Sequence, residues 1–409
     1  MIASLQGYIG KGALMLALVG ASQILPYISF LAPLYYPVMI IICIYALVFR
    51  GAQVLNFWLT VLVLVAVLGI LLSNPNALFK SWQRLVSFLI VIGACGPFIR
   101  ETHLYAIRKV AFMWTMFICV GVGVGSFIGY FWGINNMLAG KFGTGVGVFG
   151  GLTFHSMILG PMAGIGFCFM LWRLYVYQTM PQKNKLLTIF FLFALFASVL
   201  LAASRSSFLA LLLGAFMVVY QLKKERFAKL LKSILGILVV VVLLFPVIAP
   251  FTGNLLNKQK NNIEAGGVTA SRNDKWQKRL SEFKSSPLLG IGFSAMDINN
   301  TSDYDPATGV VEFGSSWLAI LSTTGILGFL CMIIILGSIF WKLYHSTSKH
   351  AVLFISILVF FAIHMLAEGY IFASGSYLFF MLWLTLGASD AFLRNETEAD
   401  LQDDETFET

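Results

Sequence analysis

Long apolar runs separated by short polar turns occupy most of this 409-residue chain. Twelve runs approach the length that a helix needs to cross a bilayer, about 20 apolar residues. They cover residues 12–31, 34–49, 54–72, 85–99, 110–131, 157–176, 186–203, 206–221, 231–250, 315–340, 351–368 and 371–389. The pattern predicts an all-α polytopic membrane protein with about 12 transmembrane helices.

The composition supports a membrane location. Hydrophobic residues make up 59% of the chain and charged residues 11%, whereas soluble domains carry about 25% charged residues. The excess apolar surface must therefore face lipid. The net charge of +9 comes from basic residues scattered between apolar runs, which does not favour nucleic-acid binding. All five cysteines lie inside apolar runs, so we expect neither disulfides nor a metal site.

The distribution of lysine and arginine predicts the orientation of the chain. If the N-terminus is cytoplasmic, the inner loops hold 16 of the 27 basic residues and the short outer loops hold 4. This excess follows the positive-inside rule and makes both termini cytoplasmic. The other 7 basic residues lie in residues 251–314, a long loop whose charge does not determine orientation.

These predictions divide the chain into four parts. Residues 1–250 form transmembrane helices 1 to 9, and residues 315–389 form helices 10 to 12. Residues 251–314 between them form one long outer loop. Residues 390–409 form an acidic cytoplasmic tail, which we expect to be disordered because its composition is strongly acidic.

The outer loop contains a predicted amphipathic helix that Ser271 or Asn273 caps and that ends near Pro287. Side chains at spacings of four, three and four share one face of it: Arg272, Trp276, Arg279 and Phe283. Its aromatic residues, with Leu280, are expected to rest on the membrane surface or on the ends of the spans. The arginines at head-group level could bind lipid phosphates without specificity, or a particular phosphate ligand.

Arg205 lies in a short polar turn between two apolar runs, in "LLAASRSSFLALLL". A charge at that depth is costly unless it is paired or reaches the head groups. Three serines surround it, and a helix begins there. Free backbone N–H groups at a helix start beside an arginine favour a phosphate site.

Acidic residues near the outer membrane surface are the candidates for proton transfer. Glu312 precedes a span and Glu368 lies at an outer turn. Each could pair with an outer arginine, or could act as a general base if burial raises its pKa. His155 at an outer helix start is a third candidate, although a histidine there is more often structural. His364 lies inside a span and is expected to be a hydrogen-bonding partner in the core.

Four segments resemble the O-antigen ligase and polymerase superfamily. They are "GVFGGLTFHSMILGPMAG", "SRSSFLALLL", "SRNDKWQKRLSEFKSSPLLGIGF" and "GSSWLAILSTTGILGFL", and the similarity covers roughly residues 140–375. The resemblance implies a GT-C-like glycosyltransferase of the bacterial inner membrane, independent of metals and cofactors. It implies that the donor is an undecaprenyl-diphosphate-linked glycan at the periplasmic face. Carried over by position, Arg205 with Arg272 or Arg279 would bind the diphosphate. We also expect Trp276 and Trp317 to stack on glycan or lipid.

The reaction class rests on one departure from the family pattern. Ligases carry a His-Asn pair before the span with the glycine motif, where this chain has Gly314 and Ser315. We therefore predict a surface-polysaccharide polymerase with Glu312 or Glu368 as the base, working beside membrane lipid, a chain-length regulator and a flippase. The alternatives are an O-antigen ligase, a twelve-helix transporter or flippase, and a structural scaffold. A transporter would usually show repeated halves and mid-membrane charges, neither of which is visible here.

Overall fold

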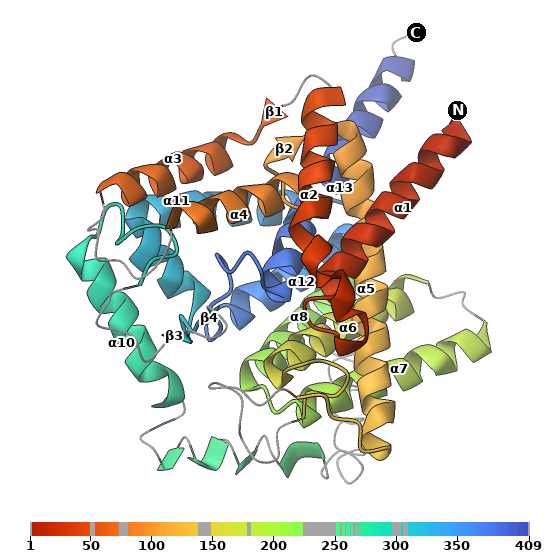
Figure 1. Ribbon diagram of the computed structural model, residues 1–409. Helices are drawn as coiled ribbons and strands as arrows, with labels where there is room; N and C mark the ends of the chain where they lie inside the picture. Colours follow the sequence, from red (N-terminus) through yellow and green to blue (C-terminus); the bar gives the residue numbers. More distant parts are fainter. Residues whose placement is uncertain are drawn as a thin grey trace.

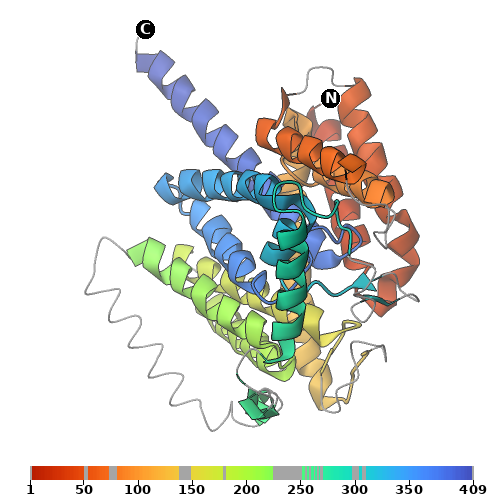
Figure 2. The ribbon, with the colours of Figure 1, turned by 90° about the vertical axis from the view of Figure 1, so that its left-hand side faces the viewer.

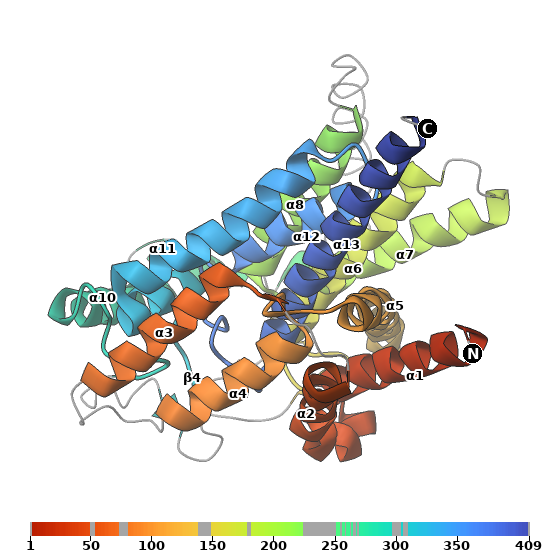
Figure 3. The same ribbon diagram turned by 90° about the horizontal axis from the view of Figure 1, so that it is seen from above.

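The computed structural model shows a bundle of packed helices (Figure 1). It describes residues 2–49, 54–72, 81–137, 149–177, 181–223, 251–253, 256–257, 259–261, 263–264, 267, 270–296, 304–305 and 310–407. Both termini lie at the end of the bundle away from helix α10 (Ala270–Ser285), as Figure 1 and Figure 3 show.

Helices account for nearly all the regular structure among these residues. The first half contains α1 (Ile2–Ala21), η1 (Pro26–Leu34), α2 (Tyr35–Ile44), η2 (Tyr45–Phe49), α3 (Phe57–Leu72), α4 (Ser81–Ala94) and α5 (Thr102–Phe131). The second contains α6 (Ser156–Val176), α7 (Gln182–Leu201), α8 (Arg205–Lys223), α10, α11 (Ser316–His345), α12 (Ala351–His364) and α13 (Tyr377–Phe407). Two short antiparallel pairs join β1 (Val54–Leu55) to β2 (Ile99–Arg100) and β3 (Tyr304–Asp305) to β4 (Val310–Val311).

The described helices are those of a polytopic membrane protein. Six helical segments within the described residues are long and apolar enough to cross a bilayer, and four shorter apolar helices accompany them. Every predicted span except one contains a helix, and the exception, residues 231–250, lies outside the described residues. The all-α class is therefore confirmed, while the number of twelve spans remains a prediction.

Three of the differences between the observed and the predicted helix boundaries have a local reason. Helix α5 begins several residues early because Glu101 caps it, accepting from the backbone N–H groups of His103 and Leu104 at 2.9 and 3.0 Å. The first predicted span is broken after α1, and a 3₁₀ segment containing Pro26 and Pro33 follows. Helix α13 runs on to Phe407, so the expected disorder of the tail was wrong. The packed first half of α13 already forms a helix, and adding further residues to an existing helix costs little free energy.

Helix α12 lies at the centre of the bundle. It packs against α6, α8, α11 and α13, and its residues are buried along almost its whole length. Helix α6 approaches closely because Gly164 faces Phe360, whose ring a Cβ at Gly164 would meet at 2.5 Å. This packing fixes the two ends of α12, one of which leads to the turn that carries Glu368.

Arg108 is fully buried, and its side chain caps the C-terminal end of α4. Its guanidinium donates to the carbonyl oxygens of Gly93, Ala94 and Ile99 at 2.6, 2.9 and 2.8 Å. Two of these are last-turn carbonyls of α4, which have no partner within their own helix. Arg108 thus satisfies backbone groups inside the protein.

We expect Arg108→Met to destabilise the protein by about 3–5 kcal/mol, because three buried carbonyls lose a charged donor. Thermal unfolding of the purified protein in detergent measures the change. The matched control is Lys11→Met, which removes an exposed charge and should leave the unfolding temperature unchanged. Equal unfolding temperatures for the two variants would contradict the structural role of Arg108.

Candidate functional site

Arg272 on α10 joins two carboxylates from distant parts of the chain. Its Nη1 lies 2.7 Å from Glu312 Oε1, and its Nη2 lies 2.6 Å from Glu368 Oε1. Glu312 precedes α11, and Glu368 lies in the turn after α12. The contact forms because α10 lies across the bundle in front of α11 and α12 (Figure 2). The structure thus brings together three residues that the sequence singled out.

Lys275, one turn further along α10, completes the environment of Glu312. Its ammonium contacts Glu312 Oε2, while Arg272 holds Oε1. Burial alone would raise the pKa of Glu312, but the hydrogen bond and charge of Lys275, together with Arg272, outweigh burial and hold the pKa below its usual value. Glu312 is therefore a carboxylate that stays ionised. The sequence analysis missed Lys275, although its spacing of three residues from Arg272 places both on one helix face.

Glu368 has a different environment from Glu312. Its side chain is 13% exposed, and burial is the main reason that its pKa rises to about 7. Arg272 opposes this rise, and the negative charge of Glu312 adds to it. The two neighbouring acids thus have pKa values shifted in opposite directions, a pattern found where one group must hold its charge and the other must exchange a proton.

Arg205 begins α8 and lies within electrostatic range of Arg272, so the two positive charges repel. Its Nη1 donates to Gln259 Oε1 at 3.0 Å. The Ser204 hydroxyl caps the helix, accepting from the Ser207 N–H at 3.3 Å, and it lies 2.7 Å from the Ser207 hydroxyl. The predicted combination of an arginine, hydroxyls and a helix start is present near Arg272.

A buried hydrogen-bonded chain ties this helix start to the turn that carries Glu368. His364 Nε2 lies 3.2 Å from the Ser207 hydroxyl, and His364 Nδ1 lies 3.3 Å from the Tyr370 hydroxyl. The Tyr370 N–H donates to Ser316 Oγ at 3.0 Å, and that hydroxyl donates to the Glu368 carbonyl at 2.7 Å. His364 is a core hydrogen-bonding partner, as predicted. Tyr370 and Ser316 were missed, because neither residue type stands out in an apolar sequence.

Trp276 and Arg279 attach α10 to the segment before α11. The Trp276 indole N–H donates to the Gly314 carbonyl at 3.1 Å. Arg279 is 1% exposed, lies 2.9 Å from Glu282 of its own helix, and stacks over the Phe313 ring at 5.2 Å. The structure therefore places Arg279 in an internal ion pair. Leu280, expected to rest on the membrane surface or on the ends of the spans, is 42% exposed.

His155 and Trp317 both have structural partners. His155 caps α6, with its Nδ1 accepting from the Met157 N–H at 3.1 Å. The first turns of α6 pack on α8, where a Cβ at Gly160 would lie 2.8 Å from Ser207 Oγ. The Trp317 indole donates to the Ala362 carbonyl at 3.0 Å, which places its polar edge between α11 and α12.

A break in α11 at Gly325 is hydrogen-bonded to the segment that follows α10. Gly325 adopts φ +64° and interrupts the helix. The freed Ile326 N–H donates to the Pro287 carbonyl at 2.9 Å, and the Ile291 N–H donates to the Ser322 carbonyl at 2.9 Å. The motifs "SSPLLGIG" and "STTGILG" are thus joined by backbone hydrogen bonds. These bonds fix the position of the C-terminal end of α10 relative to α11.

Within the described residues, no group of three or more His, Cys, Asp and Glu side chains lies close enough together to hold a metal ion. The site consists of two carboxylates, two arginines and a lysine at the end of the bundle away from the termini. Such a set can bind a multiply charged anion and can accept a proton nearby.

Comparison with known protein families finds one match to part of the chain. Residues 189–333 match the family model described as O-antigen ligase. The matched region runs from α7 to the first half of α11 and includes Arg205, Arg272 and Glu312, whereas Glu368 follows it. No curated protein matches the chain. The family match confirms the resemblance to the O-antigen ligase and polymerase superfamily.

Proposed function

We propose that this chain, which carries an O-antigen ligase family domain over residues 189–333, polymerises glycan repeat units linked to undecaprenyl diphosphate. The reaction takes place at the periplasmic face of the bacterial inner membrane. The observation that supports this proposal most directly is Arg272, which joins a low-pKa and a raised-pKa carboxylate beside Arg205.

In this proposal the arginines bind the diphosphate of the donor. Arg272 and Arg205 come from two helices and stabilise the negative charge that grows on the leaving diphosphate. The N–H groups at the start of α8 add to the positive potential. Lys275 stays with Glu312, so that carboxylate remains neutralised when Arg272 turns towards phosphate. Arg279, paired with Glu282, is assigned a positioning role for α10.

Glu368 is the proposed general base. It takes the proton from a hydroxyl of the acceptor glycan, and that oxygen forms a bond to the anomeric carbon of the donor. The bond from that carbon to the diphosphate oxygen breaks, and its electron pair leaves with undecaprenyl diphosphate. Direct displacement inverts the anomeric centre. When Arg272 moves to the donor phosphate, Glu368 loses the cation that lowers its pKa and becomes a stronger base.

Trp276 remains the candidate for stacking on a sugar of the glycan, because it lies one turn from Arg272 on the same face of α10. Trp317 and His155, like Trp276, bond to backbone groups, but neither of them lies on α10 beside Arg272. We assign these two residues to holding α11 and α6 in place.

An O-antigen ligase is the second candidate, favoured by the description of the matched family. Against it, the positions of the ligase His-Asn pair hold Gly314 and Ser315, which have structural tasks. The Gly314 carbonyl accepts from Trp276, and Ser315 caps α11. In a ligase the donor site would be the same, and the acceptor would be lipid A-core.

The test is reconstitution of the purified protein in proteoliposomes with its lipid-linked repeat unit. A ladder of lengthened glycans supports the polymerase. Transfer of one glycan to added lipid A-core, without a ladder, supports the ligase. Movement of the lipid-linked unit across the bilayer without a new glycosidic bond would overturn both and support a transporter.

At donor concentrations well below saturation, where the rate reflects the free protein, the rate is expected to rise with pH and to level off above about pH 7. Glu368 can accept a proton only when ionised, and its pKa is about 7. Below that pH, the ionised fraction and the rate fall by about tenfold per unit. Initial rates of ladder formation between pH 5.5 and 8.5 measure the profile.

Two variants test whether Glu368 causes this profile. Glu368→Gln should lower the rate by about 100-fold and leave little dependence on pH. Glu312→Gln removes a charge that raises the Glu368 pKa. The inflection in the pH profile of this variant should therefore move to lower pH. A flat profile in the native protein, or an unmoved inflection in Glu312→Gln, would contradict the assignment.

A further inference from the structure

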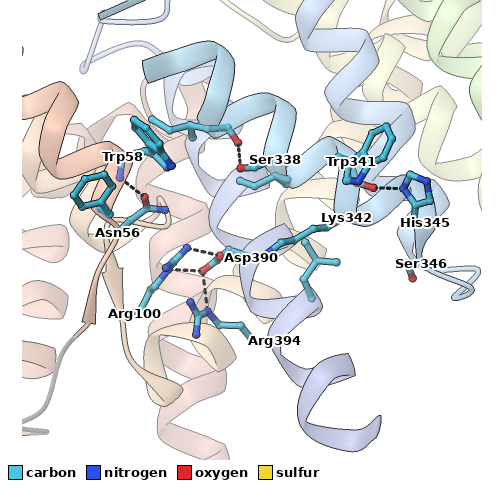
Figure 4. Close-up of a pocket in the computed structure, with 14 residues that line it drawn as sticks. Asn56, Trp58, Arg100, Ser338, Trp341, Lys342, His345, Ser346, Asp390 and Arg394 are labelled. Atoms are coloured by element: carbon cyan, nitrogen blue, oxygen red, sulfur yellow. Dashed lines mark hydrogen bonds and ion pairs between the residues drawn. The ribbon is translucent and has the colours of Figure 1, made fainter. Parts of the chain in front are cut away.

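A second polar site lies at the opposite end of α11 from the Arg272 cluster. A cavity of about 860 Å³ opens between the start of α3, the β1–β2 pair, the last turns of α11, and α13 (Figure 4). Ser316 at the proposed active site and Lys342 at this cavity are separated by about seven helical turns. The cavity is therefore distinct from the site proposed for glycosyl transfer.

The walls of this cavity carry excess positive charge. Arg100 contacts Asp390 through two hydrogen bonds of 3.0 and 3.2 Å, and Arg394 Nε lies 3.4 Å from the same carboxylate. Lys342 also lines the cavity and has no acidic partner within the described part of the chain. Three cations thus face one carboxylate, which leaves a potential that attracts an anion.

The opening of the cavity is aromatic and apolar. Trp58 and Trp341 line it and are 39% and 67% exposed. Ile335 and Ile339 form its apolar side on α11. Tryptophans of this kind occupy the level between lipid head groups and acyl chains.

The apolar surface continues away from the cavity along both helices. On α11, Leu330 and Ile333 are exposed, and on α3, Leu64 and Leu68 are exposed. Side chains of this kind on spanning helices face acyl chains. A ligand that suits both the cations and this surface has an anionic head and apolar tails.

We propose that this cavity binds the phosphodiester head group of an anionic phospholipid. Arg394, Lys342 and Arg100 contact the phosphate, and the acyl chains run along the exposed faces of α3 and α11. Basic pockets between spanning helices suit such head groups, because the phosphate replaces water at the cations while the tails stay in the bilayer. The bound lipid joins α13 to the β1–β2 pair and to α11.

The experiment is native mass spectrometry of the detergent-purified protein titrated with phosphatidylglycerol. Lys342→Gln and Arg394→Gln should each weaken binding by about fivefold, the effect of one basic residue on an anionic lipid. The matched control is Lys349→Gln, an exposed lysine after α11 that does not line the cavity. It should bind phosphatidylglycerol like the native protein. Phosphatidylcholine with the same acyl chains should bind more weakly than phosphatidylglycerol.

Two results would overturn the proposal. One is unchanged phosphatidylglycerol binding by Lys342→Gln; Lys342 is exposed and makes no ion pair among the described residues, so its replacement leaves the fold intact. The other is displacement of the lipid by millimolar inorganic phosphate, with phosphate binding lost in the same variants. That outcome would make the cavity a site for a small free anion.

Discussion

Replacing Arg272 with glutamine is expected to slow glycan polymerisation by at least about 100-fold. In the proposed reaction Arg272 stabilises the charge on the leaving diphosphate, and loss of such a contact costs about 3 kcal/mol of barrier. The same change leaves Glu368 without the cation that lowers its pKa, so the residual activity should inflect at higher pH. Initial rates of ladder formation in proteoliposomes give both quantities.

The matched control for this variant is Lys284→Gln on the same helix. Lys284 lies in the last turn of α10 and is exposed, and an exposed charge of this kind contributes little. Its loss should change the rate by less than about twofold. The rate of Arg272→Lys should fall between the rates of Arg272→Gln and the control, because an ammonium cannot hold both carboxylates in one plane. Native rates in well-inserted Arg272→Gln would refute the proposed mechanism.

Replacing Gly325 with alanine is expected to prevent correct assembly of α10 on α11. Gly325 has φ +64°, and an added Cβ would lie 2.3 Å from the backbone of Leu288. The strained φ and the contact with rigid backbone together cost roughly 3–5 kcal/mol. Gly290 faces the same junction with φ +72° and a Cβ position 2.4 Å from the Thr323 backbone, so Gly290→Ala should have the same effect. Thermal unfolding in detergent measures the loss.

Gly337→Ala provides the control within the same helix. A Cβ at Gly337 meets nothing within 4 Å, and alanine favours a helix over glycine by up to about 1 kcal/mol. The control should therefore unfold at the native temperature or slightly above it. If Gly325→Ala and Gly337→Ala unfold at the same temperature, the junction between the two motifs does not stabilise the fold.

Hydropathy predicts the helical bundle because lipid offers the backbone no hydrogen bonds, so an apolar run of sufficient length must become a helix. Glu312 and Glu368 could be singled out for a similar reason, since acids are costly near a bilayer and therefore rare. Their opposite pKa shifts were not predictable. Those shifts depend on which cation reaches which oxygen after α10 folds over the bundle.

Arg279 shows the limit of reading helix faces. It shares the face of Arg272, and the resemblance implied that Arg272 or Arg279 would bind the diphosphate. The pairing with Glu282 and the stacking on Phe313 bury Arg279, and only the tertiary position of Phe313 reveals this. The break at Gly325 was equally hidden, because a glycine inside an apolar run does not indicate whether its φ is positive.

The pairing of Arg272 with both acids has a consequence for turnover. In the proposed reaction, an incoming diphosphate must displace carboxylates that already neutralise the guanidinium, so this exchange offsets part of its attraction. As the carrier diphosphate leaves, the acids return to Arg272, so the protein's own anions compete with the product and reduce product inhibition. A polymerase of the proposed kind, which releases one long polyprenyl carrier per added repeat unit, benefits more from this internal competitor than from tighter binding of the carrier.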